Sequence, residues 1–277
     1  MTLRTNLSRL MRRPPRVSVV RLYGPIGMPG RMASSLSDEF IGPALESAFG
    51  TKPAAVALAV NSPGGSAVQS GLIASRIRRL ADETKVPVYA FCEDAAASGG
   101  YWLACAADEI WVDGASIIGS IGVISAGFGF HQAIAKVGVE RRVHTAGARK
   151  AILDPFQPER EEDVATLREM QDQIHTLFQT HVRERRGARL ADIDLFTGEF
   201  WTGARATELG LADGIGHLPS VMRDKLGEKV KFKEYGPRRA LGQRLGLVNG
   251  PNGVAADAAA AAAAQLETQA MWARLGI

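Results

Sequence analysis

The sequence contains little cysteine and no long apolar run, and each shortage argues against a class of protein. The two cysteines, Cys92 and Cys105, stand in apolar segments, which favours buried thiols in a reducing compartment over a disulfide or a metal pair. No apolar run reaches the roughly 18 residues that a membrane span needs. The basic first residues run into Pro14-Pro15 without the apolar core of a signal peptide, so we expect a cytoplasmic protein.

Acidic residues are missing from positions 1–16, which hold five arginines. The whole chain has 33 Lys and Arg against 29 Asp and Glu, so the remainder is nearly neutral and gives no reason to expect nucleic-acid binding. Leucines recur at helical spacing between the arginines of residues 1–13. This pattern predicts a basic N-terminal arm in weak peripheral contact with an anionic membrane at the inner face, with a frayed terminus as the alternative.

The rest of the chain alternates strand-like and helix-like segments. Apolar, branched runs predict strands over 17–23, 54–60, 86–92, 109–113, 138–144 and 230–235, with an edge or crossing strand within 116–124. Apolar periodicity predicts helices over 38–49, 101–107, 130–137, 158–186, 204–209 and 255–274, and one beginning near Ser66. Continuous apolar strands are typical of a parallel sheet covered on both faces. We therefore expect an α/β domain over 17–235, then a linker and an alanine-rich helix over 236–277.

One segment places a serine among the smallest side chains, Asp94-Ala95-Ala96-Ala97-Ser98-Gly99-Gly100-Tyr101. Ser98 falls where a strand's loop turns into a helix, and a helix start presents free N–H groups and positive partial charge. A hydroxyl there could attack a carbonyl while the N–H of Gly99 faces the developing oxyanion. The alternative is that Ser98 is an ordinary helix N-cap.

Two further segments could complete such a site. Asn61-Ser62-Pro63-Gly64-Gly65 is a turn after a strand, where the N–H of Gly65 could be a second oxyanion donor; an ordinary βα turn is the alternative. Thr145-Ala146-Gly147-Ala148-Arg149-Lys150 places Lys150 among small residues, 52 positions after Ser98. Most lysines are solvated, so the alternative for Lys150 is a surface position.

Acyl transfer at Ser98 requires a base. The five histidines are His131, His144, His175, His181 and His217, and none stands in a glycine-rich loop; His175 and His181 fall on the long predicted helix. A lysine can serve instead if burial keeps it neutral. We expect the hydroxyl of Ser120 to lie beside the amine of Lys150 and to orient that amine.

Four segments taken together resemble the signal peptide peptidase A (SppA) family of serine peptidases, in its short single-domain form. They are Asn61-Ser62-Pro63-Gly64-Gly65, Ala96-Ala97-Ser98-Gly99-Gly100-Tyr101, Gly119-Ser120-Ile121-Gly122-Val123 and Gly147-Ala148-Arg149-Lys150. Phe200-Trp201-Thr202-Gly203, with Leu209-Gly210-Leu211-Ala212-Asp213, resembles a later signature of that family. The order and spacing of the segments carry the resemblance, which covers about residues 17–235.

The resemblance implies a Clp/crotonase-like α/β fold with a mostly parallel sheet, βα units and flanking helices. It implies a Ser-Lys dyad in which Ser98 is the nucleophile, Lys150 the general base and Ser120 the lysine-orienting hydroxyl, with Gly65 and Gly99 as oxyanion glycines. It also implies ring-like homo-oligomers whose dyads join adjacent protomers, and cleavage of signal-peptide remnants, membrane-derived or unfolded peptides. We expect neither a cofactor nor a metal.

The same sequence pattern has three other interpretations. Clp proteases have similar turns but use a histidine where this chain has Val123. A crotonase-like acyl-CoA enzyme would need carboxylates near the turns, of which Glu93 and Asp94 are the close ones, and it would leave Lys150 unexplained. A non-catalytic scaffold of the same fold is the third alternative.

Overall fold

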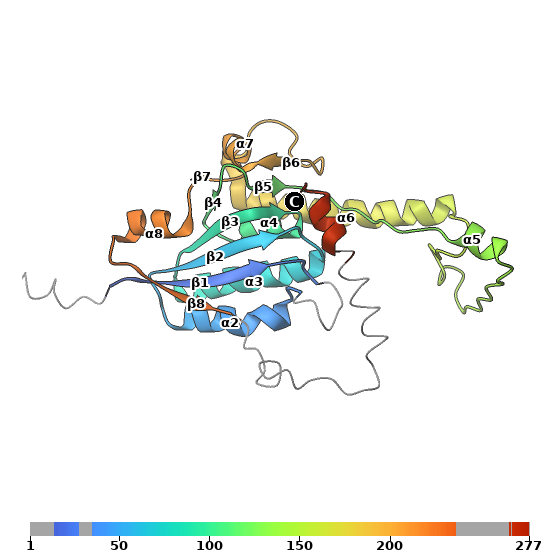
Figure 1. Ribbon diagram of the computed structural model, residues 1–277, viewed down its shortest axis with the longest axis horizontal. Coiled ribbons are helices and arrows are strands. Elements are labelled where there is room, and N and C mark those ends of the chain that lie inside the picture. Colours follow the sequence, from blue (N-terminus) through green and yellow to red (C-terminus); the bar gives the residue numbers. More distant parts are fainter. Residues whose placement is uncertain (1–13, 28–34, 237–265, 267, 277) are drawn as a thin grey trace, which may run out of the picture.

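The computed structural model describes residues 14–27, 35–236, 266 and 268–276 (Figure 1). Within them, one eight-stranded sheet runs in the order β6-β5-β3-β2-β1-β8, and β4 pairs with both β3 and β7. The strands are β1 (Arg16–Tyr23), β2 (Ala55–Ser62), β3 (Val88–Ala97), β4 (Glu109–Val112), β5 (Ile117–Gly119), β6 (Phe200–Thr202), β7 (Gly214–Ile215) and β8 (Lys231–Tyr235). The pairs are parallel except β5 with β6, so the predicted mostly parallel α/β sheet is confirmed.

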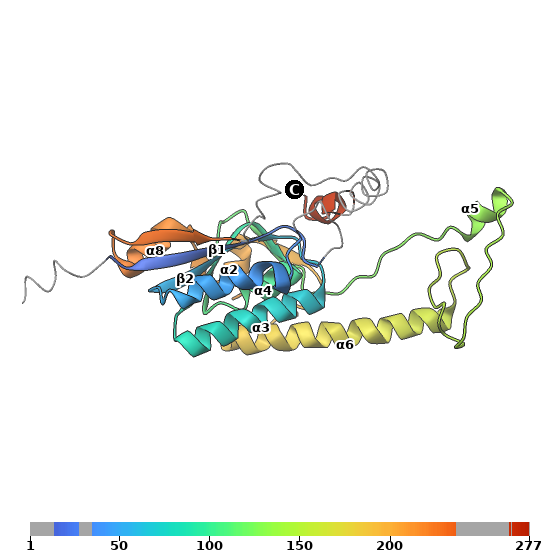
Figure 2. The ribbon, with the colours of Figure 1, turned by 90° about the horizontal axis from the view of Figure 1, so that it is seen from below.

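Helices cover both faces of this sheet. They are α2 (Asp38–Gly50), α3 (Ala67–Thr84), α4 (Gly99–Ala104), α5 (His131–Lys136), α6 (Glu161–Arg186), α7 (Gly203–Glu208) and α8 (Leu218–Leu226), with a short 3-10 turn, η1 (Gly187–Arg189). Figure 2 shows α2, α3 and α6 gathered on one side. Side chains alternate along β1: Val20 and Leu22 join the core on the side of α2 and α3, while Val17 and Val19 pack with α8.

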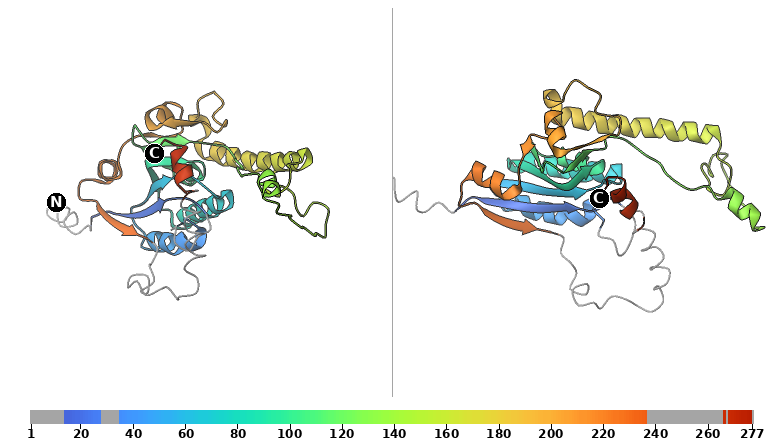
Figure 3. Two further views of the ribbon diagram at one scale, coloured as in Figure 1. Left: turned by 45° about the vertical axis from the view of Figure 1, so that its right-hand side comes forward. Right: turned by 45° about the horizontal axis from the view of Figure 1, so that its top comes forward.

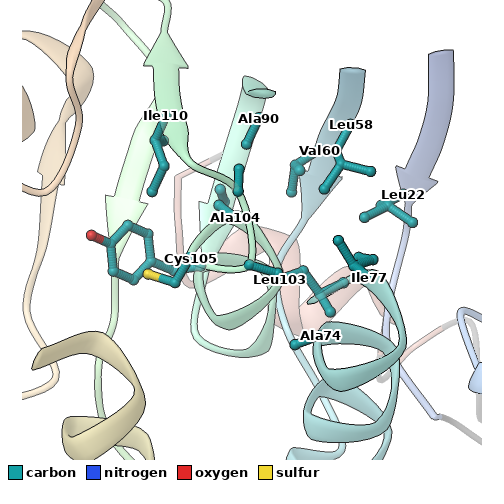
Figure 4. Packing of buried hydrophobic residues seen from close by; sticks show 14 of the residues in the cluster. Leu22, Leu58, Val60, Ala74, Ile77, Ala90, Leu103, Ala104, Cys105 and Ile110 are labelled. Carbon is teal, nitrogen blue, oxygen red and sulfur yellow. The ribbon is translucent and has the colours of Figure 1, made fainter. Parts of the chain in front are cut away.

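The larger core lies between the sheet and helices α2, α3 and α4. Figure 4 shows Leu22 and Leu58 of the strands lying toward Ile77 of α3 and Leu103 of α4. These four side chains are fully buried. Burying a side chain of this kind stabilises the fold by about 1.5–3 kcal/mol, so this layer fixes how α4 meets the sheet.

Helix α6 is anchored at its C-terminal half only. Phe178 stacks on Trp102 of α4 with ring centroids 4.8 Å apart, and the buried Arg186 guanidinium forms an ion pair with Asp213, Nη1 to Oδ2 2.7 Å. The other half projects from the body, together with residues 124–160, which form an extension that includes α5 (Figures 1 and 3). No residue in the described stretch 122–162 is buried.

Several sequence expectations are corrected or completed by the structure. Residues 138–144 form no strand, because they lie on the exposed extension with no strand beside them in the described chain. β3 continues to Ala97, so the alanines before Ser98 belong to the sheet and not to a loop. Both cysteines are buried free thiols, as predicted. The N-terminal arm of residues 1–13 and most of the predicted linker and C-terminal helix lie outside the described residues.

Among the residues that the structure describes, none of the helices combines the length and apolarity that crossing a membrane requires.

Candidate active site

Ser98 lies at the junction between the carboxyl end of β3 and the start of α4. Its backbone has φ 51° and ψ −122°, a conformation that costs a non-glycine residue of order 1–3 kcal/mol. Two hydrogen bonds hold it there: its N–H donates to Gly119 O at 2.8 Å, and Tyr101 N–H donates to Ser98 O at 2.9 Å. The sheet and the helix thus fix a strained turn that exposes the serine.

The N-cap alternative for Ser98 can be tested against other helix starts in the chain. Ser66 caps α3 by accepting from Gln69 N, and Ser37 caps α2 by accepting from Phe40 N. Ser98 occupies the N-cap position of α4, but within the described residues its hydroxyl makes no capping hydrogen bond. The hydroxyl of Ser98 is therefore left available for other chemistry.

The two glycine-rich turns meet directly beside Ser98. A side-chain carbon on Gly99 would lie 2.4 Å from Ser70 Oγ and 3.4 Å from Gly65 N, and one on Gly65 would lie 2.1 Å from Ile26 O. Only glycine fits either position. In the described part of the chain neither Gly65 N–H nor Gly99 N–H donates to a backbone carbonyl, so both donors are free to face a substrate oxygen.

A cavity of about 760 Å³ opens at this junction. Four residues predicted for the site line it together: Ser98, Gly99, Gly65 and Ser120. Its other walls are largely apolar, built by Trp102 of α4, Ile174 and Phe178 of α6, Val123, Ile124 and Phe200. The carboxyl ends of parallel strands meet at one edge of a sheet, which explains why turns distant in sequence converge here.

Ser120 follows the end of β5 and is held in an unusual conformation. Its φ is 52°, and its N–H donates to Glu199 O at 2.6 Å, next to the pairing of β5 with β6. Both serines of the pocket therefore sit at strand ends with positive φ. Backbone strain of this kind occurs often at active sites, where the surrounding structure fixes the orientation of a side chain.

Lys150 is not brought to this cavity by its own chain. It is exposed in a turn of the extension, where its N–H donates to Gly147 O at 3.2 Å, and it is not among the described residues that line the pocket. In Figures 1 and 3 the extension stands away from the sheet edge that carries Ser98. The described residues that line the pocket include no lysine.

The structure also brings His175 to the pocket. The sequence predicts its place on the long helix but no role for it in the site. Its Nε2 lies 3.1 Å from Ile121 O, so it donates to the segment that carries Ser120, and Gln179 Nε2 lies 3.3 Å from its Nδ1. The apolar stripe of α6 contained the signal, because Ile174 and Phe178 on either side face the same cavity. His181 instead stacks on Trp102, and burial lowers its pKa.

The two carboxylates near the glycine-rich turns, Glu93 and Asp94, do not line the pocket of Ser98. Glu93 accepts from Tyr23 OH at 2.6 Å and Asp94 accepts from Asn61 Nδ2 at 2.7 Å. Both line a second cavity, which is separate from that of Ser98. Among the residues described, the pocket of Ser98 has no acidic lining, so it lacks the groups that the acyl-CoA alternative requires.

The fold and the site place an uncapped serine beside two free backbone donors at the carboxyl edge of a mostly parallel sheet. Comparison with known proteins identifies the family: the sequence model of peptidase family S49 matches residues 81–231, which is more than half of the chain. The chain belongs to peptidase family S49, whose architecture is Clp/crotonase-like. The expected SppA-like resemblance is thereby confirmed.

Two relatives match most of this chain but only part of their own length. The chain is 48% identical over 271 residues to the Brucella abortus Na(+)/H(+) antiporter NhaA, covering 94% of this chain and 37% of that protein. It is 30% identical over 203 residues to the Arabidopsis thaliana chloroplastic serine protease SPPA, covering 73% of this chain and 29% of that protein. The chain therefore spans about a third of the length of these relatives. A solved mutant of a membrane-bound stomatin-specific protease aligns over 82% of the chain with 16% identity and a TM-score of 0.46.

Proposed function

We propose that this chain is a serine endopeptidase that works through a Ser-Lys dyad, with Ser98 as nucleophile and Lys150 of a neighbouring protomer as general base. The observation that carries the proposal is the strained, uncapped Ser98 beside the free N–H groups of Gly65 and Gly99. A hydroxyl and two converging donors are the parts that acyl transfer requires at one point.

The reaction proceeds by acylation and then deacylation of Ser98, each with two proton transfers. Ser98 Oγ attacks the peptide carbonyl carbon while the neutral amine of Lys150 takes the hydroxyl proton. The N–H groups of Gly65 and Gly99 hold the oxyanion, and the lysine ammonium then protonates the leaving amine. In deacylation the same lysine takes a proton from water as the water oxygen bonds to the acyl carbon, and it gives that proton to Ser98 Oγ as the ester bond breaks and the product acid leaves. The hydroxyl of Ser120 orients the amine throughout.

The exposed extension supports a base supplied by a neighbour. Residues 124–160 hold several largely exposed apolar side chains, including Ile124, Phe128, Val137 and Val139. A stretch of this kind gains stability when a partner covers it. In a head-to-tail ring the extension of one protomer would lie against the next, and Lys150 would enter that protomer's pocket and lose its solvent there.

The walls of the pocket indicate the substrate class. Trp102, Ile174 and Phe178 favour a peptide with apolar side chains next to the scissile bond. Signal-peptide remnants, membrane-derived peptides and unfolded proteins supply such segments. We propose that residues 1–16 hold the enzyme weakly at the cytoplasmic face of an anionic membrane, and that no cofactor takes part.

Similarity to the protein named as an antiporter does not lead us to propose ion transport. The chain corresponds to 37% of that protein, and the S49 match lies inside the chain. We attribute peptidase activity to the shared part.

The direct test compares casein hydrolysis by wild type with hydrolysis by Ser98→Ala, together with labelling by a serine-reactive fluorophosphonate probe. Wild type should be labelled at Ser98 and active; Ser98→Ala should be folded, unlabelled and inactive. Ser220→Ala, at an exposed position of α8, is the matched control and should behave as wild type. Hydrolysis by Ser98→Ala, or wild type that is neither labelled nor active, would reject the proposal in favour of the scaffold alternative.

A further inference from the structure

The C-terminal segment contacts the edge of the sheet that carries Ser98. Residues 268–273 are helical and lie beside the strand ends (Figures 1 and 3, red helix). Leu275 is only 9% exposed and packs with Ala95 and Ala97 of β3, and Trp272 and Ile117 pack against the same cluster. The segment is therefore anchored by apolar contacts next to the nucleophile.

This segment forms part of the catalytic pocket. Met271, Arg274 and Leu275 line the cavity that Ser98 and Gly65 also line. A peptide bound with its carbonyl at Ser98 would pass along this wall. Side chains of the segment can therefore contact the substrate, although they lie 40 to 44 residues beyond the part of the chain that the S49 model matches.

Arg274 gives the pocket its permanent charge. The other described lining residues are apolar, glycine, hydroxyl-bearing or His175, and none of them is acidic. Arg274 is exposed and takes part in no ion pair among the described residues. A guanidinium beside a peptide-binding wall has the geometry and charge to bind a carboxylate, often through two parallel hydrogen bonds.

We propose that Arg274 is a specificity-determining residue that recognises a carboxylate on the peptide substrate while the apolar walls hold the neighbouring side chains. The carboxylate belongs either to a Glu or Asp side chain or to the free C-terminus of the peptide. This inference rests on the proposed peptidase function and adds a charge preference to it.

The test uses three matched fluorogenic peptides with one apolar core: one with Glu and an amidated end, one with Gln and an amidated end, and one with Gln and a free carboxylate. Wild type should show kcat/KM about fivefold higher for at least one carboxylate peptide than for the neutral one. The peptide that gains the advantage identifies the source. Arg274→Gln should bring the ratio near one, Arg274→Glu should invert it, and Arg223→Gln on distant α8 should leave it unchanged.

A binding measurement separates this proposal from the proposed function. Fluorescence anisotropy with Ser98→Ala reports peptide affinity without turnover. Peptides that are hydrolysed at equal rates by wild type and Arg274→Gln would overturn the carboxylate site and leave the peptidase standing. Arg274-dependent binding of a carboxylate peptide with no hydrolysis by wild type would support the site and reject the peptidase. Equal affinity of Ser98→Ala for all three peptides would also overturn the site.

Discussion

Replacing Gly65 by alanine tests the close approach on which the oxyanion site depends. The added carbon would lie 2.1 Å from Ile26 O, so the backbone must move by more than about 1 Å to reach an ordinary contact of about 3.3 Å. Gly65 also has φ +141°, where an L side chain is strained by about 1–3 kcal/mol, and overpacking adds about 1–3 kcal/mol. We expect Gly65→Ala to lower the free energy of unfolding by about 2–6 kcal/mol.

The same displacement should reduce catalysis beyond the loss of stability. Removing one oxyanion donor typically lowers kcat by about 10²–10³, and moving Gly65 N–H by an ångström misdirects that donor. Urea unfolding gives the stability change, and kcat for a fluorogenic peptide under conditions where the variant is folded gives the catalytic change.

Gly71→Ala, in the second turn of α3, is the matched control. Its added carbon would lie 3.9 Å from Trp102 Cζ2, an ordinary contact, at a position where alanine favours the helix. This variant should gain about 1 kcal/mol and keep its activity. If Gly65→Ala matched wild type in both stability and kcat, the assigned approach of Gly65 to Ile26 and its role as a donor would be refuted.

Three further outcomes follow from burial, ion pairing and the arm. Burial raises the pKa of both thiols, that of Cys105 to about 12, so a thiol reagent should modify Cys92 and Cys105 only after unfolding; a fast-reacting thiol in the native protein would contradict this. Burial opposes the charge of Asp213, but the hydrogen bonds from Arg186 hold the pKa of this carboxyl below its ordinary value. The ion pair therefore stabilises the fold fully above about pH 4, and this stabilisation is lost as the pH falls further. Asp213→Asn should therefore lose about 3–5 kcal/mol at pH 7 by urea unfolding and less at pH 3, and equal losses would disprove the pairing. Deleting residues 1–13 should abolish sedimentation with anionic liposomes and spare peptide hydrolysis, whereas unchanged sedimentation would remove the membrane role of the arm.

Most of the fold was predictable because its signals are local. The apolar runs of β1 and β2 and the Ser66 cap of α3 are each written within a few neighbouring residues. Residues 138–144 show the limit of this reasoning. Branched residues favour a strand only where another strand can pair with them, and the extension provides none in the described chain.

The candidate site was predictable where the topology decides it. Ser98, Gly65 and Ser120 all follow strands of a parallel sheet, so their turns gather at one edge. His175 on α6 and Arg274 in the turn after the C-terminal helical residues were missed as pocket residues, because the packing of both segments depends on distant side chains. The role proposed for Lys150 cannot be read from the position of this residue in a single chain, since the contact that we propose for it is made with another copy.

Mixed assemblies test the central claim most directly. Ser98→Ala and Lys150→Ala chains are co-expressed with different tags, and assemblies shown by mass spectrometry to contain both are assayed for peptide hydrolysis. With random mixing, about a quarter of the shared sites join an intact serine to an intact lysine, so roughly a quarter of wild-type activity should return although each variant alone is inactive. Mixed assemblies that remain inactive would contradict a base supplied by the neighbouring chain.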